Sequence, residues 1–171
     1  MTKEIALFVG GTRSGKSDLA QAWLGRFRCN ATYLATLEAD GSSDERVRSH
    51  RDRRPEWLEC VELDSGGDLA PLVAGATQPC VIDSLGTWLV RFADFAAPMG
   101  DLLEAIVACP FPLAVVAELV GEGIHGADPL SRLFVDRLGE AAGGIRELAT
   151  SAYLVVAGGL VPIDLGGPQW R

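Results

Sequence analysis

One short segment near the start of the chain constrains the fold more than any other. It consists of Gly10, Gly11, Thr12, Arg13, Ser14, Gly15, Lys16 and Ser17. These residues match the pattern G-x-x-x-x-G-K-[ST] at every fixed position. The apolar run Ile5–Val9 precedes them, and the amphipathic pattern Lys16–Phe27 follows. A strand, a glycine-rich loop and a helix in this order place backbone N–H groups and a helix N-terminus around a phosphate. The sequence therefore predicts a nucleotide-binding P-loop.

Three side chains have predicted roles at this loop. Lys16 is expected to bridge the β- and γ-phosphates as a catalytic residue, and Ser17 to offer its hydroxyl to Mg²⁺. Asp83 ends the apolar run that begins at Cys80. An acidic residue at a strand's carboxyl end is the usual second Mg²⁺ ligand. Alternatively, Asp83 or Ser84 caps the helix that follows. We favour the metal role, because the P-loop needs such a ligand.

Apolar runs and helical patterns alternate along the whole chain. Five short, nearly unalternating runs are typical of buried strands: Ile5–Val9, Thr32–Ala35, Val81–Asp83, Leu113–Ala117 and Tyr153–Ala157. Helical patterns cover Lys16–Phe27, Ser43–Asp52, Leu85–Phe95, Gly100–Ala108 and Pro129–Leu148. A sixth strand at Val161–Leu165 could form a hairpin after Gly158-Gly159. This order predicts a single α/β domain over residues 1–171, with a mostly parallel sheet flanked by helices in three layers.

Composition restricts the class of partner. The chain has 171 residues and a formal net charge of −8, which argues against nucleic acid, because phosphate contacts need a basic face. Its apolar runs are far shorter than the roughly 20 residues of a membrane-spanning helix, and the N-terminus lacks a signal-peptide pattern. The four cysteines lack zinc-site spacing. We expect a cytoplasmic protein that acts on small molecules.

A histidine lies within the most basic part of this acidic chain. His50 has arginines at positions 46, 48, 51, 53 and 54 around it. Neutral imidazole can attack an α-phosphate, and neighbouring cations favour the neutral form and stabilise departing pyrophosphate. A solvated helix face, with the arginines paired to nearby carboxylates, explains the same residues. The pattern by itself narrowly favours a surface histidine over a nucleophile.

A wider set of motifs resembles one known family. After the P-loop come Y-L-A-T at residues 33–36, R-V-R-S-H-R-D-R-R-P-E-W at 46–57 and V-I-D-S-L-G-T-W-L at 81–89. Further similar segments follow at residues 120–124, 132–136 and 155–158, in the same order. Together they resemble the bifunctional adenosylcobinamide kinase/adenosylcobinamide-phosphate guanylyltransferases of cobalamin biosynthesis. The arginine inside the P-loop and the H-x-x-x-R-P-x-W block are the most specific features.

The resemblance implies a two-part reaction. A nucleoside triphosphate, ATP or GTP, phosphorylates a hydroxyl of adenosylcobinamide, and GTP then transfers GMP through a guanylylated histidine to the phosphorylated corrinoid. His50 stands at the position of that catalytic histidine. The resemblance also implies a homotrimer and nucleotide contacts, beyond the P-loop, from Ala35, Thr36, Leu37, Arg51, Asp52, Arg53, Arg54, Glu62 and Asp83.

The second half of the chain departs from the family pattern at several places. The usual S/T-N-E-V-G reads Ala117-Glu118-Leu119-Val120-Gly121, so the asparagine is lost and the acid is displaced by one residue. The usual F-R-D reads Phe134-Val135-Asp136, and G-x-x-N-Q has no counterpart near residues 139–147. Two alternatives therefore stay open: a P-loop kinase without guanylyl transfer, and a non-enzymatic nucleotide-binding partner.

Overall fold

The computed structural model describes residues 2–37, 55–64, 66–121 and 128–166. Within these ranges a seven-stranded sheet has the strand order β3-β2-β4-β5-β1-β6-β7. Every neighbouring pair is parallel except β6 and β7, which form an antiparallel hairpin. The strands are β1 (Ile5–Gly10), β2 (Ala31–Ala35), β3 (Leu58–Glu62), β4 (Cys80–Asp83), β5 (Leu113–Glu118), β6 (Ser151–Val156) and β7 (Gly159–Ile163).

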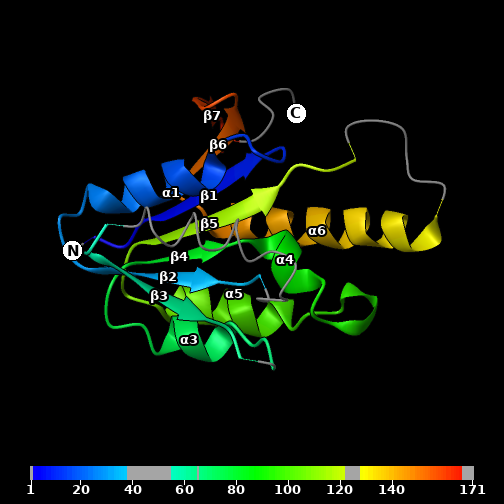
Figure 1. Cartoon of the computed structure of the whole chain (residues 1–171), viewed down its shortest axis with the longest axis horizontal. Coiled ribbons are helices and arrows are strands. Elements are labelled where there is room, and N and C mark those ends of the chain that lie inside the picture. Colours follow the sequence, from blue (N-terminus) through cyan, green and yellow to red (C-terminus); the bar gives the residue numbers. More distant parts are fainter. Residues whose placement is uncertain (1, 38–54, 65, 122–127, 167–171) are drawn as a thin grey trace.

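Helices cover both faces of this sheet (Figure 1). On one face lies α1 (Lys16–Gly25), whose buried Ala20 and Leu24 pack on the apolar side chains of β1, β4 and β5. On the other face lie α3 (Ala70–Ala74), α4 (Leu85–Leu89), α5 (Met99–Ala108) and α6 (Pro129–Leu148), which share the larger core cluster. Each central strand therefore buries both of its faces, as parallel strands covered by helices must. The predicted three-layer α/β class is confirmed.

Several elements differ from the sequence prediction. Strand β3 and helix α3 were not predicted. The helix predicted over Leu85–Phe95 ends at Leu89, and a short 3-10 turn, η1 (Ala93–Phe95), follows. It stops because Phe92 is extended and Asp94 adopts a positive φ of 51°. Helix α1 ends two residues before the predicted Phe27. The predicted helix Ser43–Asp52 lies outside the described residues.

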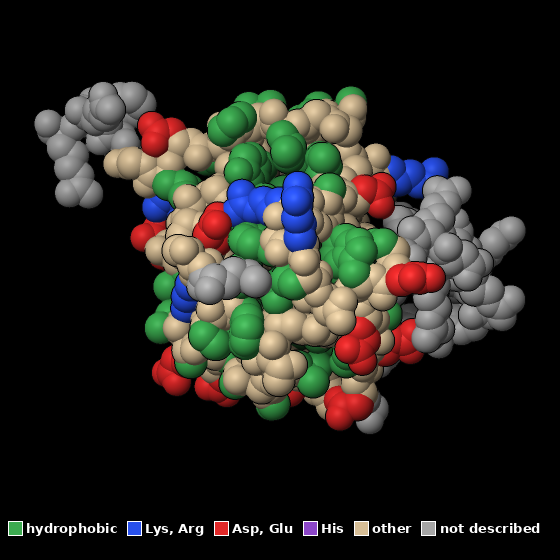
Figure 2. Space-filling model, turned by 90° about the vertical axis from the view of Figure 1, so that its left-hand side faces the viewer, with side chains coloured by type: hydrophobic (Ala, Val, Ile, Leu, Met, Phe, Trp, Pro, Cys, Tyr) green, Lys and Arg blue, Asp and Glu red, His purple; other side chains and the backbone are tan. Residues whose placement is uncertain are grey.

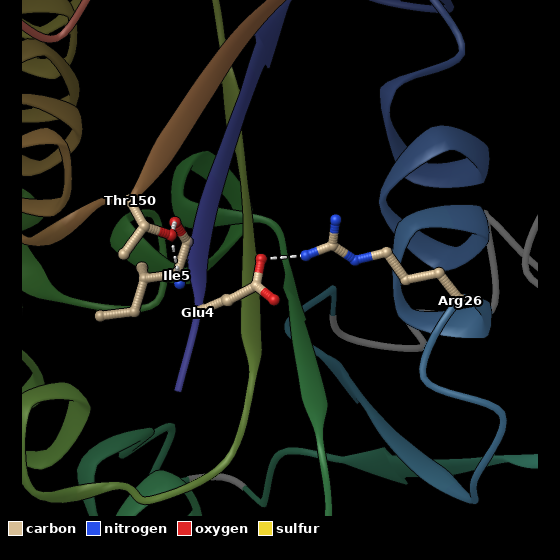
Figure 3. A network of polar contacts seen from close by, with 4 residues as sticks. All are labelled: Glu4, Ile5, Arg26 and Thr150. Carbon is tan, nitrogen blue, oxygen red and sulfur yellow. Dashed lines mark hydrogen bonds and ion pairs between the residues drawn. The ribbon is translucent and has the colours of Figure 1, made fainter. Parts of the chain in front are cut away.

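Polar contacts hold the amino end of β1 in place (Figure 3). The Ile5 N–H donates to Thr150 Oγ1 at 3.0 Å, and the Thr150 hydroxyl donates to the Ile5 carbonyl at 2.9 Å. Glu4 pairs with Arg26, just beyond the end of α1. Strand β1 is thus fixed to α1 and to the start of β6, and its other end leads directly into the P-loop. None of the described helices is long and apolar enough to cross a membrane.

Candidate active site

The P-loop lies between the carboxyl end of β1 and the start of α1. Arg13 and Gly15 adopt positive φ values of 60° and 93°. Lys16 is only 8% exposed, and its Nζ donates to the Gly11 carbonyl at 3.2 Å, so its ammonium group points back across the loop. Among the described residues no side chain caps the N-terminus of α1. Its first N–H groups are therefore available to phosphate oxygens, as an anion site requires.

The turn of the β6–β7 hairpin contacts and supports the P-loop. The Gly158 N–H donates to the Ser14 carbonyl at 2.9 Å. A Cβ on Gly15 would come within 3.5 Å of the Gly158 Cα, and a Cβ on Gly10 would lie 2.6 Å from the Val155 carbonyl. Two segments far apart in sequence, the P-loop and the β6–β7 hairpin, thus meet, and there is no space for a larger residue at Gly10. The hairpin turn fixes the path of the phosphate loop.

We expect Gly158→Ala to disturb this support. Gly158 has a φ of 78°, and its added Cβ would meet nothing within 4 Å, so the cost is purely conformational. A left-handed conformation costs an L-residue about 1–2 kcal/mol. The variant should have a lower melting temperature and weaker nucleotide binding, measured by thermal unfolding with and without GTP. The control is Gly143→Ala in α6, which also meets nothing and should stabilise the helix slightly. An unchanged response to GTP would contradict the supporting role.

Asp83 lies at the same edge of the sheet, on the face that α1 covers. Its Oδ2 accepts a hydrogen bond from the Tyr33 hydroxyl, and Tyr33 belongs to the cluster that contains Ala20 and Leu24 of α1. The N-cap of α4 is Ser84, whose N–H donates to Thr87 Oγ1 at 3.2 Å in a capping box. The helix start is therefore capped without Asp83, and the metal role stays a prediction for that carboxylate.

Ser17 and Asp83 suit Mg²⁺ by their chemistry. Mg²⁺ takes hard oxygen ligands, and usually one or two from protein with the rest from water and substrate phosphates. Ser17 supplies a hydroxyl in the first turn of α1, and α1 contacts β4, which ends at Asp83. Among the described residues no group of three or more His, Cys, Asp or Glu side chains could hold a metal by itself. A cation here would thus depend on nucleotide phosphates for further ligands.

Strand register brings several predicted nucleotide contacts into one row. Ala35 at the end of β2 pairs with Glu62 of β3 on one side and with Asp83 of β4 on the other. Thr36, the next residue, is fully buried, and its hydroxyl bonds both the N–H and the carbonyl of Ser84, at 2.7 and 2.8 Å. Leu37, which follows Thr36, is exposed. His50, Arg51, Asp52, Arg53 and Arg54 lie outside the described residues.

Sequence reasoning did not propose a site role for Glu118, the last residue of β5. Its carboxylate accepts hydrogen bonds from the Ser84 hydroxyl and, at 2.9 Å, from the Gly86 N–H. Glu118 pairs with Gly10, the first residue of the P-loop. The strand-end position that identified Asp83 was a signal for Glu118 as well. Cys80 of β4 offers no comparable chemistry, because burial, and then the nearby Cys109, raise the pKa of its thiol to about 12.

A P-loop at the carboxyl edge of a mostly parallel sheet defines this chain as a P-loop nucleotide-binding α/β protein. Residues 6–163 match the family described as cobinamide kinase / cobinamide phosphate guanyltransferase. This match covers most of the chain, and the chain therefore belongs to that family. It is a transferase with the two activities that the family description names.

Three relatives agree with this family. The bifunctional adenosylcobalamin biosynthesis protein CobP of Pseudomonas aeruginosa is 31% identical over 169 residues, which cover 94% of this chain and 96% of the relative. The bifunctional adenosylcobalamin biosynthesis protein CobU of Salmonella typhimurium is 31% identical over 174 residues, which cover 89% of this chain and 95% of the relative. CobU of Escherichia coli is 29% identical over 174 residues, with the same coverage. The similarity extends along nearly the full length of each protein.

Proposed function

We propose that this enzyme phosphorylates the hydroxyl of adenosylcobinamide and then transfers GMP from GTP to the resulting phosphate through a guanylylated His50. The phosphate loop is the observation that carries the proposal. Its left-handed residues Arg13 and Gly15, its buried Lys16 and the N-terminus of α1, which no described side chain caps, support an anion site at the carboxyl edge of the sheet. Both steps begin with a nucleoside triphosphate, ATP or GTP, held at that edge.

The kinase step needs positioning and charge. Lys16 would contact the transferred phosphate, while Ser17 and Asp83 would hold Mg²⁺, which neutralises charge on the phosphate oxygens. The corrinoid hydroxyl oxygen forms a bond to the γ-phosphorus as the bond to the β-phosphate oxygen breaks. The hydroxyl proton leaves to solvent or to a nearby base. Because transfer is direct, this step needs no covalent enzyme intermediate.

The guanylyl step needs a nucleophile. An imidazole nitrogen of His50 forms a bond to the α-phosphorus of GTP, and the bond to pyrophosphate breaks. A phosphate oxygen of the corrinoid then displaces the histidine and takes the GMP. Two observations support this proposal: the H-x-x-x-R-P-x-W block and the family match across residues 6–163. Arg51, Arg53 and Arg54 would stabilise the leaving pyrophosphate.

The test uses GTP labelled at either the α- or the γ-phosphate, with and without adenosylcobinamide. The proposed function predicts that the α-label stays on denatured protein, and that the γ-label reaches the corrinoid. If neither label stays on the protein but the γ-label still reaches the corrinoid, the enzyme is a kinase without guanylyl transfer. Binding without transfer or pyrophosphate release would show a non-enzymatic nucleotide-binding partner.

We expect Asp83→Asn to weaken the Mg²⁺ dependence of nucleotide binding. The amide keeps the size of the side chain and can still accept from Tyr33, but it removes the charge that attracts the cation. Titrating Mg²⁺ against the affinity for GTP, by calorimetry, should show a higher Mg²⁺ midpoint in the variant. A normal Mg²⁺ response with a lower melting temperature would assign Asp83 a structural role only.

Assembly, cellular location and partners complete the proposal. We propose a cytoplasmic homotrimer whose single domain over residues 1–171 acts on small molecules, without nucleic acid. The β6–β7 hairpin supports assembly, because Leu160, Val161 and Ile163 are 40–51% exposed. Hydrophobic side chains also gather at the top of Figure 2, where Figure 1 places β7. Such patches mark protein contacts.

Light scattering should give a mass three times that of one chain. Val161→Asp should lower the measured mass, because it places a charge in the exposed apolar surface of β7.

A further inference from the structure

We propose that Glu118 is a positioning residue that holds the Asp83–Ser84 segment, and through it the Mg²⁺ ligand, in place beside the P-loop. The inference rests on the proposed function of Asp83 and goes beyond it, because it assigns a role to a side chain that the resemblance marked only as a departure from the family pattern. In this role Glu118 acts through Ser84 and the adjacent Asp83.

Glu118 lies between the strand that leads into the P-loop and the strand that ends at Asp83. It ends β5, the strand that lies between β1, which leads into the P-loop, and β4, which ends at Asp83. Its backbone neighbour across the sheet is Gly10, and the next N–H, that of Leu119, donates to the Gly10 carbonyl at 2.9 Å. The backbone at Glu118 is thus fixed to β1, the strand that leads into the P-loop. Its side chain extends toward Ser84 and Gly86, which follow β4.

Both carboxylate oxygens of Glu118 are used on the segment after Asp83. Oε1 accepts from the Ser84 hydroxyl, and Oε2 accepts from the Gly86 N–H at 2.9 Å. Hydrogen bonds to a charged acceptor are roughly twice as strong as neutral ones. A Cβ on Gly86 would collide with the Glu118 carboxylate, so the glycine provides the space in which the acid lies. The first turn of α4 is therefore built around this carboxylate.

Thr36, the residue after β2, holds the Asp83–Ser84 segment as well. The Thr36 hydroxyl accepts from the Ser84 N–H at 2.7 Å and donates to the Ser84 carbonyl at 2.8 Å. The Thr36 N–H donates to the Asp83 carbonyl at 3.1 Å. Ser84 is 4% exposed and is held through its backbone by Thr36, which follows β2, and through its hydroxyl by Glu118 of β5. Removing Glu118 would release one of the supports of Ser84, and Asp83 is the adjacent residue.

The test separates positioning from charge by comparing Glu118→Gln with Glu118→Ala in the full chain. Glutamine keeps both contacts: its oxygen accepts from the Gly86 N–H, and its amide N–H donates to the Ser84 oxygen. Alanine removes both. Groups that orient a metal ligand typically change metal affinity 10- to 100-fold when removed. Glu118→Ala should raise the Mg²⁺ midpoint for GTP binding by about 10-fold, whereas Glu118→Gln should stay within about 3-fold of the native protein.

The readout is GTP affinity by calorimetry as Mg²⁺ is varied, with melting temperature as the check on folding. Glu140→Ala is the matched control, because Glu140 is an exposed glutamate on α6 that pairs with Arg137 away from this edge. Equal loss in both Glu118 variants would overturn the proposal in favour of a direct role for the charge. A normal Mg²⁺ midpoint in Glu118→Ala would overturn it too. If the proposed role of Asp83 is wrong, this shows separately, because the Mg²⁺ midpoint for GTP binding is then unaltered in Asp83→Asn.

Discussion

Lys16→Ala is expected to lower the rates of both phosphorylation and guanylylation by roughly 10²–10³, because both reactions use one phosphate site. Removing one oriented group at a site of developing charge typically costs about 2.7–4 kcal/mol. Lys16 suits this role, since it is 8% exposed and its ammonium group lies within 3.2 Å of the Gly11 carbonyl inside the loop. The measurement is transfer of γ-label to the corrinoid and of α-label to the protein.

The matched control for this prediction is Lys3→Ala. Lys3 also donates to a backbone carbonyl, that of Val107, but it lies at the amino end of β1, far along the strand from the loop. Its removal should leave both rates unchanged. If the α-label still reached the protein at the native rate in Lys16→Ala, the two reactions would not share one phosphate site.

The central strands could be predicted from sequence because burial on both faces leaves a continuous apolar run. Strands β1, β4 and β5 each show that pattern, and the structure buries nearly every one of their residues. Strand β3 escaped prediction because it is an edge strand, in which Leu58 is buried but Glu59 and Glu62 are exposed. Its place in the sheet comes from pairing with β2, a contact that local sequence does not encode.

The site, like the sheet, has a part that local sequence predicts and a part that it does not. The P-loop was predictable because its glycines, lysine and serine are contiguous and each has a local conformational reason. The supports of the loop were not, because they are contacts across long sequence separations. Gly158 lies 144 residues from Ser14, and Glu118 lies 34 residues from Ser84. Nothing in a short window around either residue indicates its partner, so the three-dimensional structure is needed to find them.

His50→Ala is expected to abolish labelling of the protein from α-labelled GTP while sparing phosphorylation of the cobinamide hydroxyl. The proposed intermediate is a phosphoramidate, in which GMP is bonded to an imidazole nitrogen. Such a bond is labile in acid and stable in base, unlike a phosphate ester on serine or threonine. The native protein should therefore carry an acid-labile label, and the variant none. Phosphoryl transfer is direct, so it does not depend on this nucleophile.

The arginines beside His50 provide the internal comparison. Arg51 and Arg54 have a proposed electrostatic role, so Arg51→Ala or Arg54→Ala should slow labelling without moving it to another residue. His50→Ala instead removes the atom that carries the GMP, so no amount of time or GTP should restore the label. Mass spectrometry of the native protein after incubation with GTP should place the GMP on His50. An adduct on any other residue would end the assignment, because the family match alone does not identify the nucleophile.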